Sequence, residues 1–351
     1  MKTLEEFNVF LDQQLADELR SMEAQRVTGR NWMRRMWIVT LVPFAIFVFF
    51  LVRYSLQSSR DAAAGQATES GNPVFMIIGL VVLFSLGGYA ISYFMMKQKG
   101  GNEAADYQHD FKNRIVKPLI RFIDPTFTYQ PINHASYEEF TESGLFAKKG
   151  YGMTGNDQVY GKLGDMNFQC CDLTVTYTPT ITVRGQAPDT VFRGSYFIGQ
   201  FPRYFSTPVY ILSRGSGMER LLSNAAADND FIETWNLGKK VLPDDAAFNK
   251  LFMVYAPDAI EAQQLLTPAL MGKIISLQER TSAKLYLSFF NNRVYIGIGH
   301  GMDYFETTLN KSLQDKKMLQ NFYLDFTTVL QLAEDLKGNL PIWTSHAFSR
   351  S

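Results

Sequence analysis

Two long apolar segments near the N-terminus, neither of which contains a charged residue, constrain this chain most strongly. They cover residues 36–52 and 74–96. As α-helices with a rise of about 1.5 Å per residue they would be about 26 Å and about 35 Å long, which brackets a hydrocarbon core of roughly 30 Å. We therefore predict a transmembrane helical hairpin, with helices at residues 36–54 and 74–96 and an external loop at residues 55–73.

Two other interpretations of these segments are weaker. Two buried core helices would be unusual, because cores rarely need two uncharged runs of this length. A cleavable signal peptide is disfavoured because the first run follows about 35 residues of polar chain and no small-residue cleavage site comes after it. The mean hydropathy of -0.11 excludes a transporter with many spans.

The basic residues around the two segments indicate their orientation. Five precede the first segment, six follow the second, and two lie between them: Arg20, Arg26, Arg30, Arg34 and Arg35; Lys97, Lys99, Lys112, Arg114, Lys117 and Arg121; Arg53 and Arg60. Short loops rich in Lys and Arg stay on the cytoplasmic side. We therefore expect both termini and most of the chain to be cytoplasmic. The adjacent Cys170 and Cys171, a poor geometry for a disulfide, agree with a reducing compartment.

Residues 1–30 are predicted to form a cytoplasmic amphipathic helix. Apolar side chains recur at about the 3.6-residue period of an α-helix: Leu4, Phe7, Leu11, Leu15, Leu19 and Met22. The polar faces are rich in Asp and Glu, which fits poorly with anionic lipid. We therefore favour docking of this helix on the globular part of the chain, or its self-association, over binding to the membrane surface.

Residues 97–130 are predicted to form a juxtamembrane helix and a linker, and residues 131–351 a cytoplasmic α+β domain. An apolar stripe supports the juxtamembrane helix: Phe111, Ile115, Leu119 and Phe122. Pro118 is expected to bend it.

The α+β domain mixes strand-like and helical segments. Four runs rich in Val, Thr, Tyr and Phe predict strands, and they begin at about residues 158, 166, 190 and 207. Two alternating runs around Asn291-Asn292 predict a β-hairpin. We expect a mixed, mainly antiparallel sheet with flanking helices; the alternative is a barrel resembling pleckstrin-homology folds with a C-terminal helix.

The sequence also indicates where helices in this domain begin and end. The segment SYEEFTESGLF, from Ser136, predicts a short helix, and residues 313–336 predict a terminal helix that ends before Gly338. Asp245 and Asp258 stand where helix N-caps are expected, as does Asp244. The segment from Phe248 to Asp258 is predicted to be a strand. The segment that follows it is predicted to be a helix, in which Pro268 marks a break or a new first turn.

Several separated motifs occur in an order that resembles a known family. They are SGLF (143–146), Gly161 with Phe168, FRGSYFIGQF (192–201), FMVYAPD (252–258), LLTPALM (265–271) and LSFFNNRVYIGI (287–298). Over roughly residues 100–345 the chain resembles the bacterial domain-of-unknown-function family 3137. The resemblance implies a bacterial inner-membrane protein with no assigned activity and offers a LemA-type membrane protein as a partner. The pair Cys170-Cys171 departs from relatives, which tend to carry Ser or Glu there.

The titratable residues form no clear catalytic or metal-binding motif. The histidines His109, His134, His300 and His346 are far apart in the sequence and lack metal-site spacing. The best local cluster is His300, Asp303 and Glu306, which could bind a metal ion or supply a general acid; we favour a solvated loop at the exit of the hairpin. The GIGHG run lacks the spacing of a dinucleotide fingerprint.

The cysteines and a set of aromatic residues also have structural interpretations. Cys170 and Cys171 point to opposite faces of a predicted strand and have no basic neighbour, so one is expected in the core and neither as a nucleophile. Five aromatic residues could line a groove for a lipid or a peptide, although core filling is favoured: Phe192, Phe197, Phe201, Tyr204 and Phe205.

These observations favour a membrane-tethered protein that binds or scaffolds a protein, a peptide or a lipid headgroup. Lys plus Arg and Asp plus Glu both number 34, so nucleic acid is not expected as a partner. The bilayer and a second copy of the chain, through the spans or the N-terminal helix, are further expected partners. The alternative is a membrane-bound hydrolase whose site is assembled only in the fold, and no catalytic, cofactor or metal residue is assigned. A cleft that gathers His300, Asp303, Glu306 or either cysteine with a second titratable group would favour the hydrolase, whereas an open groove lined by aromatic residues would favour the binding protein.

Overall fold

A computed structural model describes residues 2–63, 105–146, 151–177, 189–215, 237–301, 305–307, 312–336 and 343–344, and the single positions 79, 87, 90, 93 and 94. The chain divides into two compact units. The first comprises Met1–Gln14, Val116–Glu306 and Lys316–Ser351, and the second comprises Leu15–Ile115 and Thr307–Asp315.

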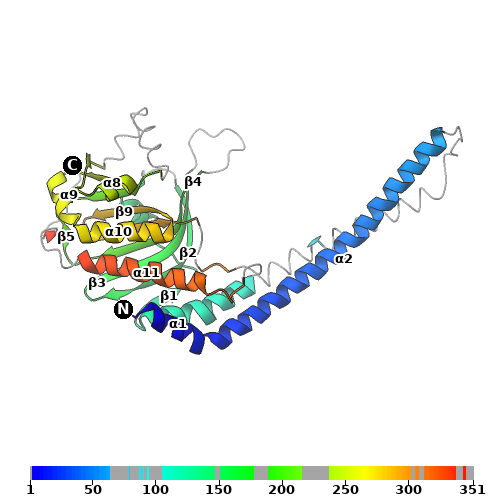
Figure 1. The fold of residues 1–351 in the computed structure, drawn as a ribbon, viewed down its shortest axis with the longest axis horizontal. Coiled ribbons are helices and arrows are strands. Elements are labelled where there is room, and N and C mark those ends of the chain that lie inside the picture. The colour runs from blue at the N-terminus through cyan, green and yellow to red at the C-terminus, as the bar shows by residue number, and fades with distance from the viewer. Residues whose placement is uncertain are drawn as a thin grey trace. The chain divides into compact units, whose positions relative to one another are not determined.

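The first unit is built on a sheet of nine strands in the order β1-β2-β3-β4-β10-β9-β6-β8-β7 (Figure 1). The strands are β1 (Thr128–Gln130), β2 (Tyr151–Leu163), β3 (Met166–Tyr177), β4 (Asp189–Gln200), β6 (Val209–Ser213), β7 (Lys239–Val241), β8 (Phe252–Ala256), β9 (Lys284–Phe290) and β10 (Arg293–Gly299). Each described pair is antiparallel. The predicted α+β class with a mainly antiparallel sheet is thus confirmed. The described strands form an open sheet with β1 and β7 at its edges. They do not close into the barrel that was the alternative prediction.

The predicted hairpin of β9 and β10 lies near the middle of this sheet. Asn291 in its turn has a φ of 54°, a left-handed conformation that Asn tolerates better than most residues. The return strand β10 pairs with β9 on one side and with β4 on the other. A separate two-stranded sheet joins β5 (Tyr204–Phe205) to β11 (Trp343–Thr344).

Helices α10 (Pro268–Thr281) and α11 (Lys317–Asp335) lie along one face of the large sheet (Figure 1). The apolar side of α11 is buried, including Phe322, Phe326 and Val329. An ion pair of 2.9 Å between Arg280 and Asp325 joins the two helices. This face of the sheet is therefore covered by two amphipathic helices.

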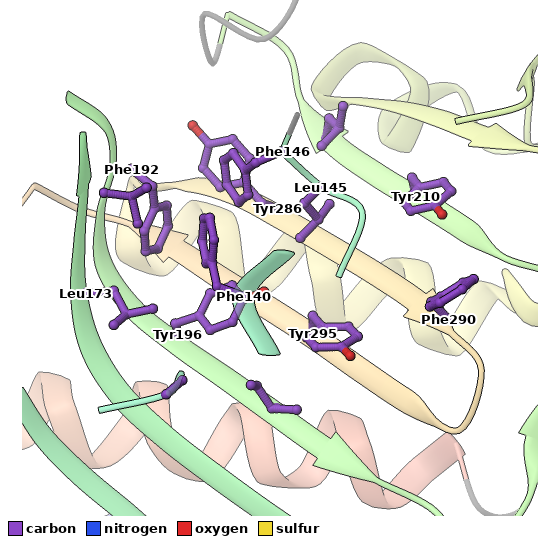
Figure 2. Close-up of a cluster of buried hydrophobic side chains, with 14 of the residues drawn as sticks. Phe140, Leu145, Phe146, Leu173, Phe192, Tyr196, Tyr210, Tyr286, Phe290 and Tyr295 are labelled. Carbon is purple, nitrogen blue, oxygen red and sulfur yellow. The ribbon is translucent and has the colours of Figure 1, made fainter. Parts of the chain in front are cut away.

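The opposite face carries a cluster of buried aromatic and aliphatic side chains (Figure 2). Helix α5 (Tyr137–Glu142) and the SGLF segment pack here, with the rings of Phe140 and Phe146 stacked at 4.7 Å. The predicted helix is confirmed for Tyr137–Glu142, and Ser136 and Glu139 form a reciprocal capping box at its start. The prediction is wrong for the remaining SGLF residues, which are not helical. The hydroxyl of Ser288 on β9 donates to the carbonyl of Ser143 over 2.6 Å, which ties the segment to the sheet.

Side chains that cap the first turn fix where three further helices begin. Asp245 caps α8 (Ala246–Leu251), Asp258 caps α9 (Ala259–Leu265) and Thr267 caps α10, as expected for the two aspartates and for a new first turn at Pro268. The strand predicted from Phe248 is wrong in its first part. Residues 248–251 complete α8 because Asp245 accepts a hydrogen bond from the amide of Phe248, and β8 begins only at Phe252.

The first helix of the chain belongs to the sheet unit. Helix α1 (Leu4–Gln13) places Phe7 against Tyr323 of α11 and Phe10 against Phe122 of α4 (Lys117–Ile123), both with ring centroids 4.2 Å apart. For this part of the amphipathic segment, docking is the arrangement found. The helix is interrupted after Gln13, and α2 (Ala16–Ala63) begins after the break.

The second unit contains the long helix α2, helical residues 105–111 and the π-helical turn η1 (Lys112–Val116) as far as Ile115. This turn ends just before Pro118, which lacks an N–H donor and whose ring, in a regular α-helix, would crowd the carbonyl four residues earlier. The apolar side chains of Leu19, Met22, Tyr107 and Phe111 are buried.

A charged pair links α2 to the segment Thr307–Asp315 within the second unit. The carboxylate of Glu23 accepts hydrogen bonds from Arg26 at 2.7 Å and 2.9 Å. It also accepts from the backbone amide of Leu313 and from the hydroxyl of Ser312. The hydrogen bonds to Arg26 lower the pKa of Glu23 to about 2.

Among the helices of the described residues, none combines the length and the apolar character needed to cross a membrane. The first predicted span, residues 36–54, lies within α2. The second, residues 74–96, falls outside the described residues except for five single positions. The two spans therefore stay a prediction.

Candidate functional site

Three adjacent strands bring polar side chains together at the point where β10 ends beside the middle of β3 and β4. Asp172 of β3 is the register partner of Ser195 of β4, and Ser195 is the partner of Ile298 of β10. His300 follows directly after the end of β10. The hydroxyl of Ser195 donates to Oδ1 of Asp172 over 2.6 Å and lies 3.2 Å from Nε2 of His300. We call these three residues the Asp172–Ser195–His300 cluster.

The direction of the hydrogen bonds in this cluster limits the chemistry that it can perform. Asp172 is 7% exposed, and a buried carboxylate needs hydrogen-bond donors. Ser195 is one such donor, so its single proton points to Asp172 and is not directed at the imidazole. In a serine nucleophile the proton is directed at the base, and the carboxylate orients that base from its far side. The arrangement found therefore makes Ser195 a bridge between the two titratable groups.

A pocket of about 220 Å³ opens beside the cluster. Its lining comes from β2, β3, β4 and the segment after β10: Thr154, Gly155, Asn156, Asp172, Leu173, Thr174, Arg193, Gly194 and Glu306. The lining is mainly polar and holds one guanidinium and two carboxylates. We call it the Arg193–Glu306 pocket.

Two of the charged side chains in this lining form no ion pair with any other described residue. Among the residues that the structure describes, neither Arg193 nor Glu306 forms an ion pair. The only hydrogen bond to the Glu306 side chain within that part of the chain is a long one of 3.5 Å from the amide of Asn156. Both side chains are exposed at the pocket and can contact a ligand.

Two glycines allow the strands around the pocket to approach closely. A Cβ atom on Gly194 would lie 1.9 Å from the carbonyl oxygen of Ile298, and one on Gly155 would lie 2.5 Å from the carbonyl oxygen of Asp172. Both contacts are with backbone, which cannot move without breaking the strand pairing. The pocket wall therefore depends on residues without side chains at these positions.

Part of this chain is similar to a known family. Residues 190–338 match the model of the family described as Protein of unknown function (DUF3137). The match runs from β4 through α11, so it includes Arg193, Ser195, His300 and Glu306 but not Asp172. It supports the family resemblance predicted from the sequence for this region. No curated protein and no solved structure matches the chain.

The candidate residues named from the sequence are only partly brought together. Within the DUF3137 region, His300 belongs to the cluster and Glu306 lines the pocket, whereas Asp303 lies outside the described residues. In the described parts of the chain, no group of three or more His, Cys, Asp and Glu residues is placed to hold a metal ion.

The other histidines have local partners or lie outside the described residues. His109, before the DUF3137 region, is bonded to Asn113 at 3.0 Å, and His134 is bonded to the carbonyl of Ala135 at 2.7 Å. His346 falls in a part that the structure does not describe.

The cysteines lie on opposite faces of β3, as expected. Cys171 is buried in the cluster of Figure 2, and Cys170 is partly exposed. Burial raises the pKa of Cys171 to about 12 and also raises the pKa of Cys170 well above its usual range. Neither environment favours the thiolate that a nucleophile requires.

The aromatic residues proposed for a groove fill the interior instead. Phe192, Phe197, Phe201 and Phe205 are each 3% exposed or less, and Tyr204 is half-buried. Core filling, the favoured interpretation, is confirmed for the four phenylalanines.

A second, larger pocket of about 390 Å³ lies against β2, β3 and β4 near α5. Its polar groups mostly bond to each other: the amide of Gln158 donates to Gln169 over 2.6 Å, and Gln169 donates to Glu139 over 2.5 Å. Arg293 is paired with Glu142 at 2.6 Å. Both charged side chains of this pocket, Glu139 and Arg293, therefore have partners among the described residues.

Reasoning from the sequence missed Asp172, Arg193 and Ser195. One signal was present, because Asp172 and Arg193 are single charges in otherwise apolar or hydroxyl-rich strand segments, QCCDLTV and TVFRGSY. Their convergence depends on the pairing of β3, β4 and β10, which no local pattern reveals.

Proposed function

We propose that this chain is a bacterial inner-membrane protein whose tethered cytoplasmic domain binds a protein, peptide or lipid partner at the Arg193–Glu306 pocket. The observation that carries the proposal is the presence of two charges of opposite sign, without ion-pair partners among the described residues, in one pocket. Exposed charges of this kind in a concave site are available for recognition.

Exposed apolar side chains on α2 support the membrane tether. Ile38, Val48, Phe49 and Val52 are 40–59% exposed and fall in the uncharged run 36–52. Several exposed apolar side chains in one short segment are unfavourable in water and favour a lipid or protein environment. The flanking Arg and Lys residues favour cytoplasmic termini.

A hydrolase is the second candidate. It is favoured by the 3.2 Å distance between Nε2 of His300 and Oγ of Ser195, which is close enough for proton transfer. The hydrogen bond from Ser195 to Asp172 counts against it, because the hydroxyl would have to turn toward His300 before attacking a substrate.

The tether is tested by expressing the full chain in a bacterium and extracting the membranes with alkaline carbonate. We expect the chain to stay in the membrane fraction. A reporter that is active only outside the inner membrane should be inactive when fused to Ser351 and active when inserted near residue 64. Release by carbonate, or activity of the fusion at Ser351, would contradict the proposal.

Partner binding is tested by crosslinking and pull-down of the detergent-solubilised full chain. The double variant Arg193→Gln with Glu306→Gln should lose its partners, while Arg203→Gln, an exposed residue remote from the pocket lining, should keep them. A LemA-type membrane protein and a second copy of the chain are the first candidates to identify. Hydrolysis of an ester or amide library that Ser195→Ala and His300→Ala both abolish would favour the enzyme instead.

A further inference from the structure

We infer that the Arg193–Glu306 pocket takes a small zwitterion, with an ammonium group close to a carboxylate or a phosphate. This inference rests on the proposed function, because it requires that the pocket bind a ligand. It adds the chemical class of that ligand, which neither the family match nor the sequence indicates.

The pocket lining carries charges of both signs. The guanidinium of Arg193 favours an anion, whereas the carboxylates of Glu306 and Asp172 favour a cation. A ligand with one charge would meet attraction from one wall and repulsion from the other. A ligand that carries both charges can place each beside its opposite, and this complementarity gives specificity.

Arg193 and Glu306 do not form an ion pair with each other in the structure, although both line the pocket. If Arg193 and Glu306 were bonded to each other, a ligand would have to break that pair before binding. Among the described residues neither side chain has an ion-pair partner, although both line one small pocket. A zwitterion would therefore gain two charge-assisted contacts without first disrupting one, and a planar guanidinium suits the two oxygens of a carboxylate or a phosphate.

The size and the lining of the pocket favour a small polar ligand. A volume of about 220 Å³ lies below the range of roughly 300–1,000 Å³ typical of drug-sized ligands. Thr154, Asn156 and Thr174 supply further hydrogen-bonding groups, and Leu173 is the only large apolar side chain in the lining. This lining suits a small polar ligand better than a long apolar side chain.

Two sources supply this chemistry: a free α-amino acid and the phosphoethanolamine headgroup of a lipid. We therefore propose isothermal titration of the detergent-solubilised full chain with L-serine, glycerophosphoethanolamine, acetate and ethylamine. At least one of the two zwitterions should bind at least tenfold more tightly than either singly charged probe. Preference for L-serine would indicate the free amino acid, and preference for glycerophosphoethanolamine the headgroup.

Single-charge variants locate the site. Arg193→Gln and Glu306→Gln should each weaken zwitterion binding at least tenfold, because each removes one of the two charged contacts. Arg203→Gln and Glu279→Gln, which change the same charges at exposed positions outside the pocket lining, should leave binding unchanged. Unaltered circular dichroism spectra and thermal midpoints would show that the variants are folded.

Three results would overturn the inference. In the first, acetate or ethylamine binds as tightly as the zwitterions and only one of the two variants matters; the proposed function then stands with a singly charged ligand. In the second, neither zwitterion binds although pull-down still depends on the pocket, which leaves a macromolecular partner. In the third, zwitterions bind equally well to both variants, which places their site elsewhere. Loss of partner capture with zwitterion binding intact would instead contradict the proposed partner while the inference holds.

Discussion

The rings of Phe7 and Tyr323 stack with their centroids 4.2 Å apart and their planes inclined by 11°. The two residues lie near opposite ends of the chain, and both are buried in the same compact unit. The hydroxyl of Tyr323 also donates to the carbonyl of Lys2 over 2.5 Å. Helix α1 is therefore a structural part of the sheet unit and closes its core beside α11 and α4.

This packing predicts a large cost for truncating Phe7. The substitution Phe7→Ala should lower the free energy of unfolding of the sheet unit by about 3 kcal/mol, because it removes a fully buried ring and leaves a cavity. The matched control is Val9→Ala on the same helix, where the side chain is 51% exposed and the change should stay within about 0.5 kcal/mol. Urea denaturation of the detergent-solubilised chain measures both, and equal midpoints for the two variants would show that α1 is not docked.

The charged pair of the second unit predicts a dependence on pH. Because the folded pKa of Glu23 is about 2 and its ordinary value is 4.5, its contribution to stability is full above about pH 5 and is lost as the pH falls toward 2. Glu23→Gln should therefore destabilise the unit by about 3 kcal/mol at pH 7, and by less at pH 3. Hydrogen exchange of the amide of Leu313, which donates to Glu23, reports this locally.

The control for this prediction is Glu5→Gln, an exposed residue of α1. Its substitution should leave the exchange of the Leu313 amide unchanged at both pH values. A loss of protection in Glu23→Gln that is the same at pH 3 as at pH 7 would refute the assigned pKa shift.

The two cysteines should be unreactive in the folded chain. With a pKa of about 12, only about one Cys171 thiol in ten thousand is ionised at pH 8, and the pKa of Cys170 is raised as well. Iodoacetamide at pH 8 should therefore label Cys171 at least a hundredfold more slowly in the native chain than in urea, and should also label Cys170 more slowly, as followed by mass spectrometry. Rapid labelling of Cys171 under native conditions would contradict its burial.

Local features of the fold could be predicted from the sequence because they depend on neighbouring residues. The caps at Asp245 and Asp258, the capping box at Ser136 and the turn at Asn291 each involve contacts within a few positions. The error at Phe248 has the same origin, since an apolar and aromatic run is compatible with a strand, and here the cap at Asp245 decides for a helix.

The arrangement of the site could not be predicted in this way. Ser195 and His300 are separated by 105 positions, and they meet only because β10 is inserted between β4 and β9 in the sheet. Strand order is set by the packing of both faces and by long-range pairing, which leave no periodic signal in one segment. His300 and Glu306 were therefore visible as residues, while their partners Ser195, Arg193 and Asp172 were not.

The close approach of β4 and β10 predicts the effect of adding one methyl group. In Gly194→Ala the new Cβ would lie 1.9 Å from the carbonyl oxygen of Ile298 and 3.2 Å from Cα of Gly299, and the residue has a φ of 153°. Relief of this overlap requires β10 to move away from β4 at the register pair of Ser195 and Ile298. We expect a loss of about 3 kcal/mol in stability, and a displacement of His300 from Ser195.

The matched control is the same substitution on α10. A Cβ on Gly272 would meet nothing within 4 Å, and Ala is the better helix former by about 1 kcal/mol, so Gly272→Ala should raise the thermal midpoint while Gly194→Ala lowers it. Differential scanning calorimetry of the full chain compares the two. If Gly194→Ala left the midpoint unchanged, the pairing of β4 with β10 and the cluster built on it would be wrong, because this backbone contact cannot accept a side chain.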